Sequence, residues 1–278
     1  MIAHSTLEDL VDPFDAFLID QFGVLLSGDG AYPFAPDALD RLCRAGKKLV
    51  LLSNSGKRSK PNEDRLTRLG FSRESYMGVL SSGEAAYHHL ESRIGKDIPP
   101  GAAVLVLSRD NDVSAIAGLD LAPTDAAGQA GLVLLAGSRG DVFDLAHYQK
   151  ILAPAAERGI PCLCTNPDTT MLTKDGLCFG AGRIAQLYEE LGGAVEWIGK
   201  PHPLIYGTAK SWLGGIDPTR VLCVGDSPAH DILGGQRAGF KTALVRTGIH
   251  ANDPQDAVLE LCQGHQALPD FLIPRFGF

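Results

Sequence analysis

Residues 17–25 read FLIDQFGVL: a short apolar run ends at Asp20, and Gly23 follows directly after it. Similar apolar runs recur along the chain and alternate with segments of helical spacing, first a helix expected over residues 36–45 and then a strand over 48–53. This alternation is typical of parallel βαβ architecture. We therefore expect an α/β fold with a Rossmann-like, three-layer core built on a parallel sheet.

The middle of the chain contains a second set of apolar runs, at residues 104–107, 131–135 and 160–164. Helical stretches lie between these runs, and the first pattern then resumes with another apolar run at residues 221–224. Such an interruption indicates a smaller α/β domain inserted into the first one. The expected division is a core of residues 1–82 and 182–278 and an inserted cap domain of residues 83–181.

The amino-acid composition of the chain limits the kinds of molecule that it is expected to bind. Of the 278 residues, 45% are hydrophobic, which is enough for a substantial core. The formal net charge is -8 and no run of Lys or Arg exceeds two, so the sequence offers no positive surface for nucleic acid or an anionic membrane. Because the first residues lack the features of a signal peptide and no stretch has the length of a membrane span, we expect a cytoplasmic protein with a small-molecule partner.

The six cysteines do not form the Cys-x-x-Cys pairs that indicate a zinc or redox site. Cys162 and Cys164 alternate within an apolar run, and Cys223 lies inside another. We therefore expect them to be small buried side chains. The aromatic tail, residues 269–278, is expected to be a terminal strand that packs on the core, with an exposed dimer surface as the less favoured alternative, so a homodimer stays open.

Polar residues follow three of the apolar runs, at the strand ends where open parallel sheets bind ligands. They are Asp20, residues 53–55 (SNS) and Asp226, with Asp231 five residues further on. Carboxylates at neighbouring strand ends repel unless a cation lies between them, and such oxygen ligands suit Mg²⁺. Lys200 and the hydroxyl and amide donors beside the ion would complete a phosphate pocket.

In this order, the segments resemble the four motifs of the haloacid dehalogenase superfamily: DQFGVL at residues 20–25, LLSNS at 51–55, GKP at 199–201 and VGDSPAHDI at 224–232. The insertion between the second and third motifs is similar to the larger cap of the class IIA subgroup, which includes pyridoxal phosphate, nitrophenyl phosphate and nucleotide monophosphatases. The similarity covers nearly the whole chain. It implies a Mg²⁺-dependent phosphoric monoester hydrolase that acts on a small phosphorylated metabolite.

The resemblance also implies which residues act on the phosphoryl group. Asp20 would attack phosphorus and form an aspartyl phosphate, which splits hydrolysis into two steps. Ser53 would donate its hydroxyl to the phosphoryl group, together with the backbone at Asn54. Lys200 would neutralise the charge of Asp20 and of the phosphoryl group.

The metal site implied by the resemblance uses Asp20, the backbone carbonyl of Phe22 and Asp226. Asp231 would support the ion directly or through its waters.

Three residues near the end of the insertion, Thr165, Asn166 and Asp168, would lie on the cap and contact the substrate. A strand end followed by an Asn-Pro turn explains the same residues equally well.

One motif position departs from the family. Phosphatases of the superfamily have Asp-x-Asp in the first motif, and the second aspartate protonates the leaving oxygen, but the residue here is Phe22. Phenylalanine cannot transfer a proton, so a contribution of about 10²–10⁴ to the rate is missing unless another group supplies it. Candidates are His202, His230 and Asp168.

Three hypotheses follow from this departure. The first is a phosphatase that uses a substitute acid, or acts only on esters whose leaving groups need no proton. The second is a dehalogenase-like hydrolase, which the cap position disfavours because those enzymes place theirs between the first and second motifs, where only about 30 residues separate Asp20 from Ser53. The third is a noncatalytic protein that binds a phosphorylated ligand, which the presence of all the other motif residues disfavours.

Overall fold

The computed structural model describes residues 2–173 and 176–278. The chain forms two compact units, each with its own parallel sheet, so the predicted α/β fold is confirmed. The first unit comprises Met1–Ser53, Lys60–Leu80 and Lys200–Phe278, and the second comprises Asn54–Ser59 and Ser81–Gly199.

The first unit is built on a seven-stranded sheet with the order β1-β16-β15-β14-β2-β5-β6. Its strands are β1 (Ala3–His4), β2 (Ala16–Asp20), β5 (Lys48–Ser53), β6 (Gly78–Ser81), β14 (Val221–Gly225), β15 (Lys241–Val245) and β16 (Phe271–Ile273). The central strands β2, β5 and β14 pair in parallel and are buried on both faces. Such strands are continuous apolar runs, which is why the sequence predicted them correctly.

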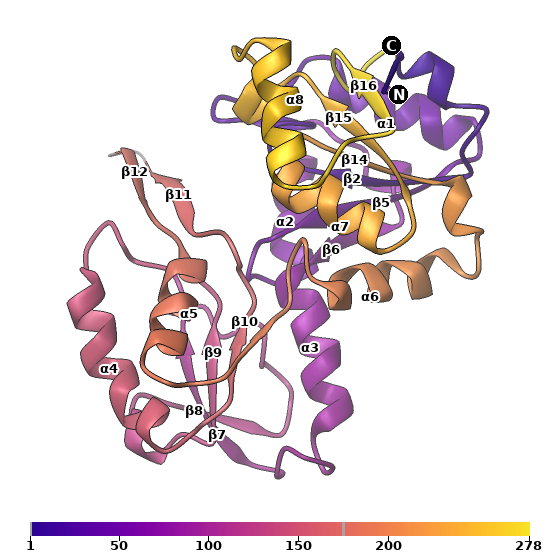
Figure 1. Cartoon of the computed structure of the whole chain (residues 1–278). Helices are drawn as coiled ribbons and strands as arrows, with labels where there is room; N and C mark the ends of the chain where they lie inside the picture. The colour runs from indigo at the N-terminus through magenta and orange to yellow at the C-terminus, as the bar shows by residue number, and fades with distance from the viewer. Residues whose placement is uncertain (1, 174–175) are drawn as a thin grey trace. The chain divides into compact units, whose positions relative to one another are not determined.

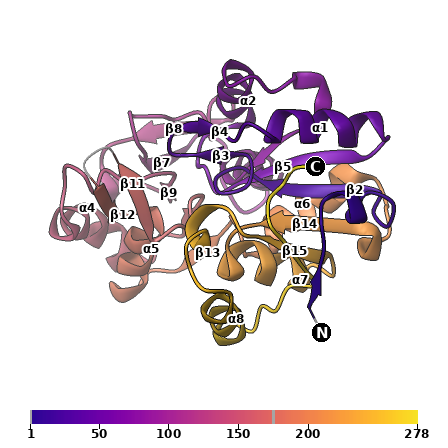
Figure 2. The same cartoon turned by 90° about the horizontal axis from the view of Figure 1, so that it is seen from above.

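Helices cover both faces of this sheet, as the three-layer prediction requires. They are α1 (Ala35–Arg44), α2 (Ser59–Arg68), α6 (Pro203–Leu213), α7 (Leu233–Arg237) and α8 (Gln255–Gly264). Figure 2 shows α1 and α2 on one side and α7 and α8 on the other. Leu39 of α1 and Leu66 of α2 pack in one apolar cluster with Ile19 of the sheet, whereas Val258 of α8 packs with Leu244 in another. A short hairpin, β3 (Leu26–Ser27) and β4 (Gly30–Ala31), follows β2.

The second unit has a five-stranded parallel sheet with the order β13-β10-β9-β7-β8. Its elements are α3 (Ser82–Arg93), β7 (Ala102–Leu107), β8 (Leu121–Thr124), β9 (Leu132–Leu135), α4 (Leu145–Glu157), β10 (Cys162–Cys164), α5 (Ala181–Glu190) and β13 (Val195–Trp197), with a hairpin of β11 (Thr170–Thr173) and β12 (Gly176–Phe179). Figure 1 shows α4 and α5 on one side of the sheet and α3 on the other. Helix α4 lies between β9 and β10, where the sequence predicted a helical stretch.

The boundary between the units differs from the predicted one. Residues 182–199 were assigned to the core, but they form α5 and β13 of the second unit. Strand β13 pairs in parallel with β10, and Ile184 of α5 packs with Leu152 of α4. Helical spacing identifies a helix but not the sheet that it covers, so the sequence alone did not indicate where the chain returns to the first unit.

The tail and the cysteines follow the sequence predictions. Residues 271–273 form β16, which pairs with β1 and β15, and Phe276 is fully buried. Cys162, Cys164 and Cys223 are buried, and all six cysteines are free thiols. None of the helices in the described ranges is both long and apolar enough to cross a membrane.

Candidate active site

The carboxylates predicted at the strand ends come together in the first unit. Strands β2 and β14 are neighbours in register, so Asp20 at the end of β2 lies beside Asp226, which follows β14. The chain then turns back through a single π-helical turn, η5 (Pro228–Ile232), which places Asp231 in the same group. One carboxylate oxygen from each of the three residues lies within 4.8 Å of the others.

Lys200 is the cation of this cluster. Its Nζ lies 2.7 Å from Asp20 Oδ1 and 2.7 Å from Asp231 Oδ1, and the residue is only 3% exposed. Burial disfavours the charged form of the lysine, but the attraction of the two carboxylates outweighs it and raises the pKa of Lys200. The lysine therefore stays protonated, and its single positive charge offsets one of the three carboxylate charges.

The remaining negative charge is not balanced by the protein. Burial raises the pKa of Asp20 to about 8, and repulsion from Asp231 and Asp226 adds to this effect against the opposing attraction of Lys200. Burial and the Asp231 carboxylate likewise raise the pKa of Asp226 to about 6. Raised carboxyl pKa values of this origin are the electrostatic condition under which a divalent cation binds favourably.

Two tight turns enclose Asp226. Gly23 and Gly248 have φ angles of +83° and +78°, and a Cβ atom on either would lie 2.0 Å or less from Asp226 Oδ2. That oxygen accepts a hydrogen bond of 2.9 Å from the backbone N–H of Ile249. Only glycine permits the backbone to approach the carboxylate so closely at positive φ, and the approach fixes the orientation of Asp226.

The donor set fits a hard cation. Asp231 is engaged at both oxygens, by Lys200 and by the backbone N–H of Ser227 at 3.2 Å. Within the described residues, no donor reaches Asp20 Oδ2 or Asp226 Oδ1, and no backbone N–H donates to the Phe22 carbonyl. These are three oxygen ligands of the kind that Mg²⁺ accepts while it keeps several waters.

The residues predicted to bind phosphate begin at the end of β5. Ser53 is the last residue of that strand, next to β2, and it is largely buried. Asn54 follows it in the chain but packs with the second unit, where its side chain donates to Asp168 Oδ1 at 2.8 Å. The side-chain amide of Asn54 is therefore engaged. The contact predicted between Asn54 and the phosphoryl group uses the backbone of this residue and does not require its side chain.

The predicted cap residues follow β10 in the second unit. Thr165 is fully buried, and its hydroxyl donates to the carbonyl of Leu135 at 3.3 Å. Asn166 Oδ1 accepts from the backbone N–H of Asp168 at 3.2 Å. The Thr165 hydroxyl thus holds β10 to β9, and Asn166 stabilises the turn that presents Asp168 to Asn54.

The side chain of Phe22 is 52% exposed and carries no group that transfers a proton. Of the candidate substitutes, His202 is the N-cap residue of α6 and His230 belongs to η5. His202 is two positions from Lys200 in the chain, and His230 directly precedes Asp231.

Sequence reasoning missed two parts of the site. The first is the loop at residues 247–249, where Thr247 donates to the Gly23 carbonyl and Ile249 donates to Asp226. This loop follows the apolar strand β15, so the rule that polar residues follow strand ends would have found it. The second is Arg65, which approaches Phe22 from α2 and for which the sequence contains no signal.

Comparison with known proteins agrees with this fold. The family model described as "Haloacid dehalogenase-like hydrolase" matches residues 17–122, and a related hydrolase-like model matches residues 197–273. Human chronophin is 32% identical over 279 residues, which cover 97% of this chain and 93% of the relative. The chain therefore belongs to the haloacid dehalogenase-like hydrolases.

Two solved structures place the chain among enzymes with the same architecture. The p-nitrophenyl phosphatase from Archaeoglobus fulgidus superposes with a TM-score of 0.77 at 26% identity and covers 95% of this chain and 97% of its own. A glycerol phosphate phosphatase from Mycobacterium tuberculosis in complex with magnesium superposes with a TM-score of 0.78 at 23% identity, covering 96% of this chain and 77% of its own. The second likeness concerns the fold alone.

Proposed function

We propose that this hydrolase is a Mg²⁺-dependent phosphatase that acts on a small phosphate monoester through an aspartyl phosphate at Asp20. The observation that carries the proposal is the buried cluster in which Lys200 contacts two of three carboxylates. One oxygen of Asp20 and one of Asp226 have no protein donor among the described residues. The similarity to the p-nitrophenyl phosphatase from Archaeoglobus fulgidus supports the same reaction class. The free thiols fit a reducing cytoplasm as its compartment.

In the proposed reaction, a carboxylate oxygen of Asp20 forms a bond to phosphorus while the bond to the leaving oxygen breaks. The attraction of Lys200 favours the ionised form of Asp20, and its charge also offsets negative charge on the phosphoryl group. The Ser53 hydroxyl donates to a phosphoryl oxygen. Asp20, the Phe22 carbonyl and Asp226 would hold Mg²⁺, which supplies further charge neutralisation when bound. Water then attacks phosphorus and releases phosphate, which restores the Asp20 carboxylate.

The proposal also includes the second unit as a cap domain whose residues contact the substrate. Asp168 and Asn166 are the residues that would reach a substrate from the turn after β10. The pair formed by Asp168 and Asn54 supports this assignment, because Asn54 directly follows the proposed phosphate ligand Ser53.

The test is hydrolysis of 4-nitrophenyl phosphate with and without Mg²⁺ in the wild type, in Asp20→Asn and in Asp12→Asn. We expect Mg²⁺-dependent phosphate release that falls by a factor of at least about 10³ in Asp20→Asn, since the nucleophile is lost. Asp12 is an exposed aspartate of the same unit, so Asp12→Asn should keep full activity. Activity that survives in Asp20→Asn would remove Asp20 as the nucleophile.

Two other results would replace the proposal. Halide release from haloacids without Mg²⁺ would favour dehalogenation. Tight, Mg²⁺-dependent binding of phosphate esters without turnover would favour a binding protein.

A further inference from the structure

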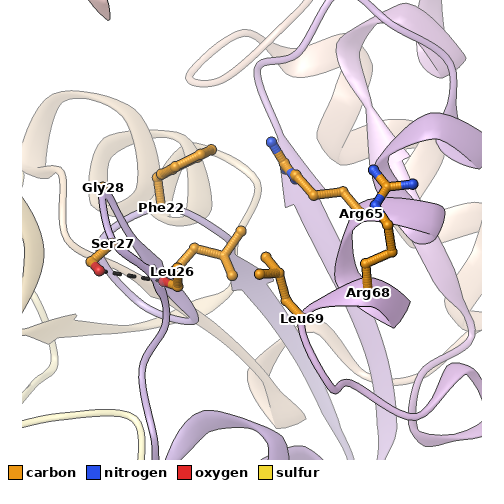
Figure 3. A pocket seen from close by; sticks show the side chains of 8 residues that line it. Phe22, Leu26, Ser27, Gly28, Arg65, Arg68 and Leu69 are labelled. Atoms are coloured by element: carbon orange, nitrogen blue, oxygen red, sulfur yellow. Dashed lines mark hydrogen bonds between the residues drawn. The ribbon is translucent and has the colours of Figure 1, made fainter. Parts of the chain in front are cut away.

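A cavity of about 280 Å³ lies in the first unit beside the turn that contains Phe22 (Figure 3). It is formed by the turn after β2, the β3–β4 hairpin and the last turns of α2. Its walls are two glycines of the hairpin together with Phe22, Leu26, Ser27, Arg65, Arg68 and Leu69. Its volume is at the lower end of the range for small-molecule sites, which suits one ring with a substituent.

Two arginines of α2 give this cavity a positive charge. Within the described part of the chain, neither Arg65 nor Arg68 forms an ion pair with a carboxylate. Arg65 Nη2 donates to the side-chain carbonyl of Gln21, while its buried Nε has no hydrogen-bond partner. Burial and the nearby charge of Arg68 lower the pKa of Arg65, although a guanidinium remains charged in proteins. A bound anion would offset the unpaired positive charge of these two arginines.

A second buried donor adjoins Arg65. Gln21 is only 1% exposed, and its Nε2 has no partner among the described residues. Buried polar groups are nearly always hydrogen-bonded, so these two N–H groups leave the polar interior beside Arg65 incompletely satisfied. Both atoms are shielded from solvent, and Gln21 does not line the cavity, so a ligand there would bind other N–H groups of the Arg65 guanidinium. A carboxylate offers several acceptor positions to such donors.

The rest of the cavity is apolar. Figure 3 shows Leu26 and Leu69 pointing toward one another and the Arg65 side chain extending from α2 toward Phe22. The Arg65 guanidinium carbon lies 5.1 Å from the centre of the Phe22 ring, more than half of whose side chain is exposed. An exposed ring with a cation beside it is suited to stack on a second ring that carries a negative group.

We propose that this cavity binds the leaving group of the substrate, and that the substrate is an aryl phosphate whose ring carries a carboxylate. The inference rests on the proposed phosphatase activity for the position of the phosphoryl group, since Phe22 is two residues from Asp20. Arg65 would pair with the carboxylate while the ring lies against Phe22 and Leu26. The same class suits a site without a proton donor at position 22, because an aryl oxygen leaves as a delocalised anion.

The test compares 4-carboxyphenyl phosphate with its neutral analogue, 4-carbamoylphenyl phosphate. In the wild type, we expect the KM for the carboxylate to be about tenfold lower, the ratio that a charge-assisted hydrogen bond produces. Arg65→Gln should bring the two KM values to within about twofold of each other. Lys60→Gln is the matched control, because it removes one positive charge from an exposed position on the same helix.

Equal KM values for the two esters in the wild type, or the same change in Lys60→Gln as in Arg65→Gln, would overturn the proposal. A second measurement tests binding in the cavity independently of ester hydrolysis. It is an NMR titration of the protein with 4-hydroxybenzoate and 4-hydroxybenzamide. Preferential binding of 4-hydroxybenzoate that is lost in Arg65→Gln supports the cavity even if no ester is hydrolysed. Hydrolysis of 4-nitrophenyl phosphate without that binding would contradict the cavity and leave the phosphatase intact.

Discussion

The cluster around Lys200 and the cavity beside Phe22 adjoin the same turn, but the buried cation of the first and the half-buried cation of the second have different neighbours. Lys200 has two carboxylates at 2.7 Å, whose combined negative charge exceeds its own positive charge. Arg65 has a neutral amide, a phenyl ring and one N–H group without a partner. A cation with protein counter-ions shapes the charge of a site, whereas a cation without them is available to a ligand. The difference separates the proposed reaction centre from the proposed recognition site.

Phe22 belongs to both regions, so replacing it should produce the largest change. Phe22→Asp would supply the missing proton donor, and we expect it to raise the rate on an alkyl ester such as glycerol phosphate by about 10²–10⁴ relative to 4-nitrophenyl phosphate. The new carboxylate would also give Arg65 a counter-ion, which should abolish the preference for 4-carboxyphenyl phosphate. The measurement is kcat/KM for the three esters.

Phe22→Asn is the control for this prediction, because it has the size of aspartate but transfers no proton at neutral pH. It should leave the ratio of alkyl to aryl rates near the wild-type value. An unchanged ratio in Phe22→Asp as well would show that another residue already acts as the acid. The candidates are His202, His230 and Asp168.

The second prediction compares how much Lys200 and Arg65 each contribute to the free energy of unfolding. Lys200→Met leaves the Asp20 and Asp231 carboxylates buried without their partner, and we expect the free energy of unfolding to fall by about 3–5 kcal/mol at pH 8 without Mg²⁺. Arg65→Met loses a hydrogen bond to Gln21 and a longer one of 3.4 Å to Asn62 but no ion pair, so it should cost only about 1 kcal/mol. Urea unfolding of both variants measures the difference. Equal losses would mean that Arg65 has a structural counter-ion after all.

The smallest expected effect is the pH dependence of metal affinity. Mg²⁺ binds the ionised carboxylates, and burial holds the pKa of Asp20 near about 8 and that of Asp226 near about 6 in the metal-free protein. Protons therefore compete with the ion at low pH, and affinity should rise with pH between 6 and 8 by at most about tenfold per unit for each proton released. Calorimetric titration at pH 6, 7 and 8 gives the slope. A flat profile would show that the ion does not displace protons from these carboxylates.

Most of the fold could be predicted from the sequence because its central strands are buried on both faces. Strands β2, β5 and β14 are continuous apolar runs, and the residues after them were correctly identified as neighbours. Strands β8 and β13 were missed because they form the two edges of the second sheet, are not fully buried and contain no apolar run. The return to the first unit was also misplaced, since neither α5 nor β13 carries a mark of the sheet to which it belongs.

The sequence by itself determined the chemical groups at the reaction centre, because the order of strand-end residues is local in the chain. It also determined the loss of the proton donor, since Phe22 occupies the position of an acid. Only the tertiary structure decided which atoms are engaged and how burial changes the charges. Arg65 reaches Gln21 across 44 positions of sequence, and the lack of a carboxylate beside it is a property of the packed chain. Charge balance depends on distances between residues that are remote in sequence, and no spacing within the sequence encodes those distances.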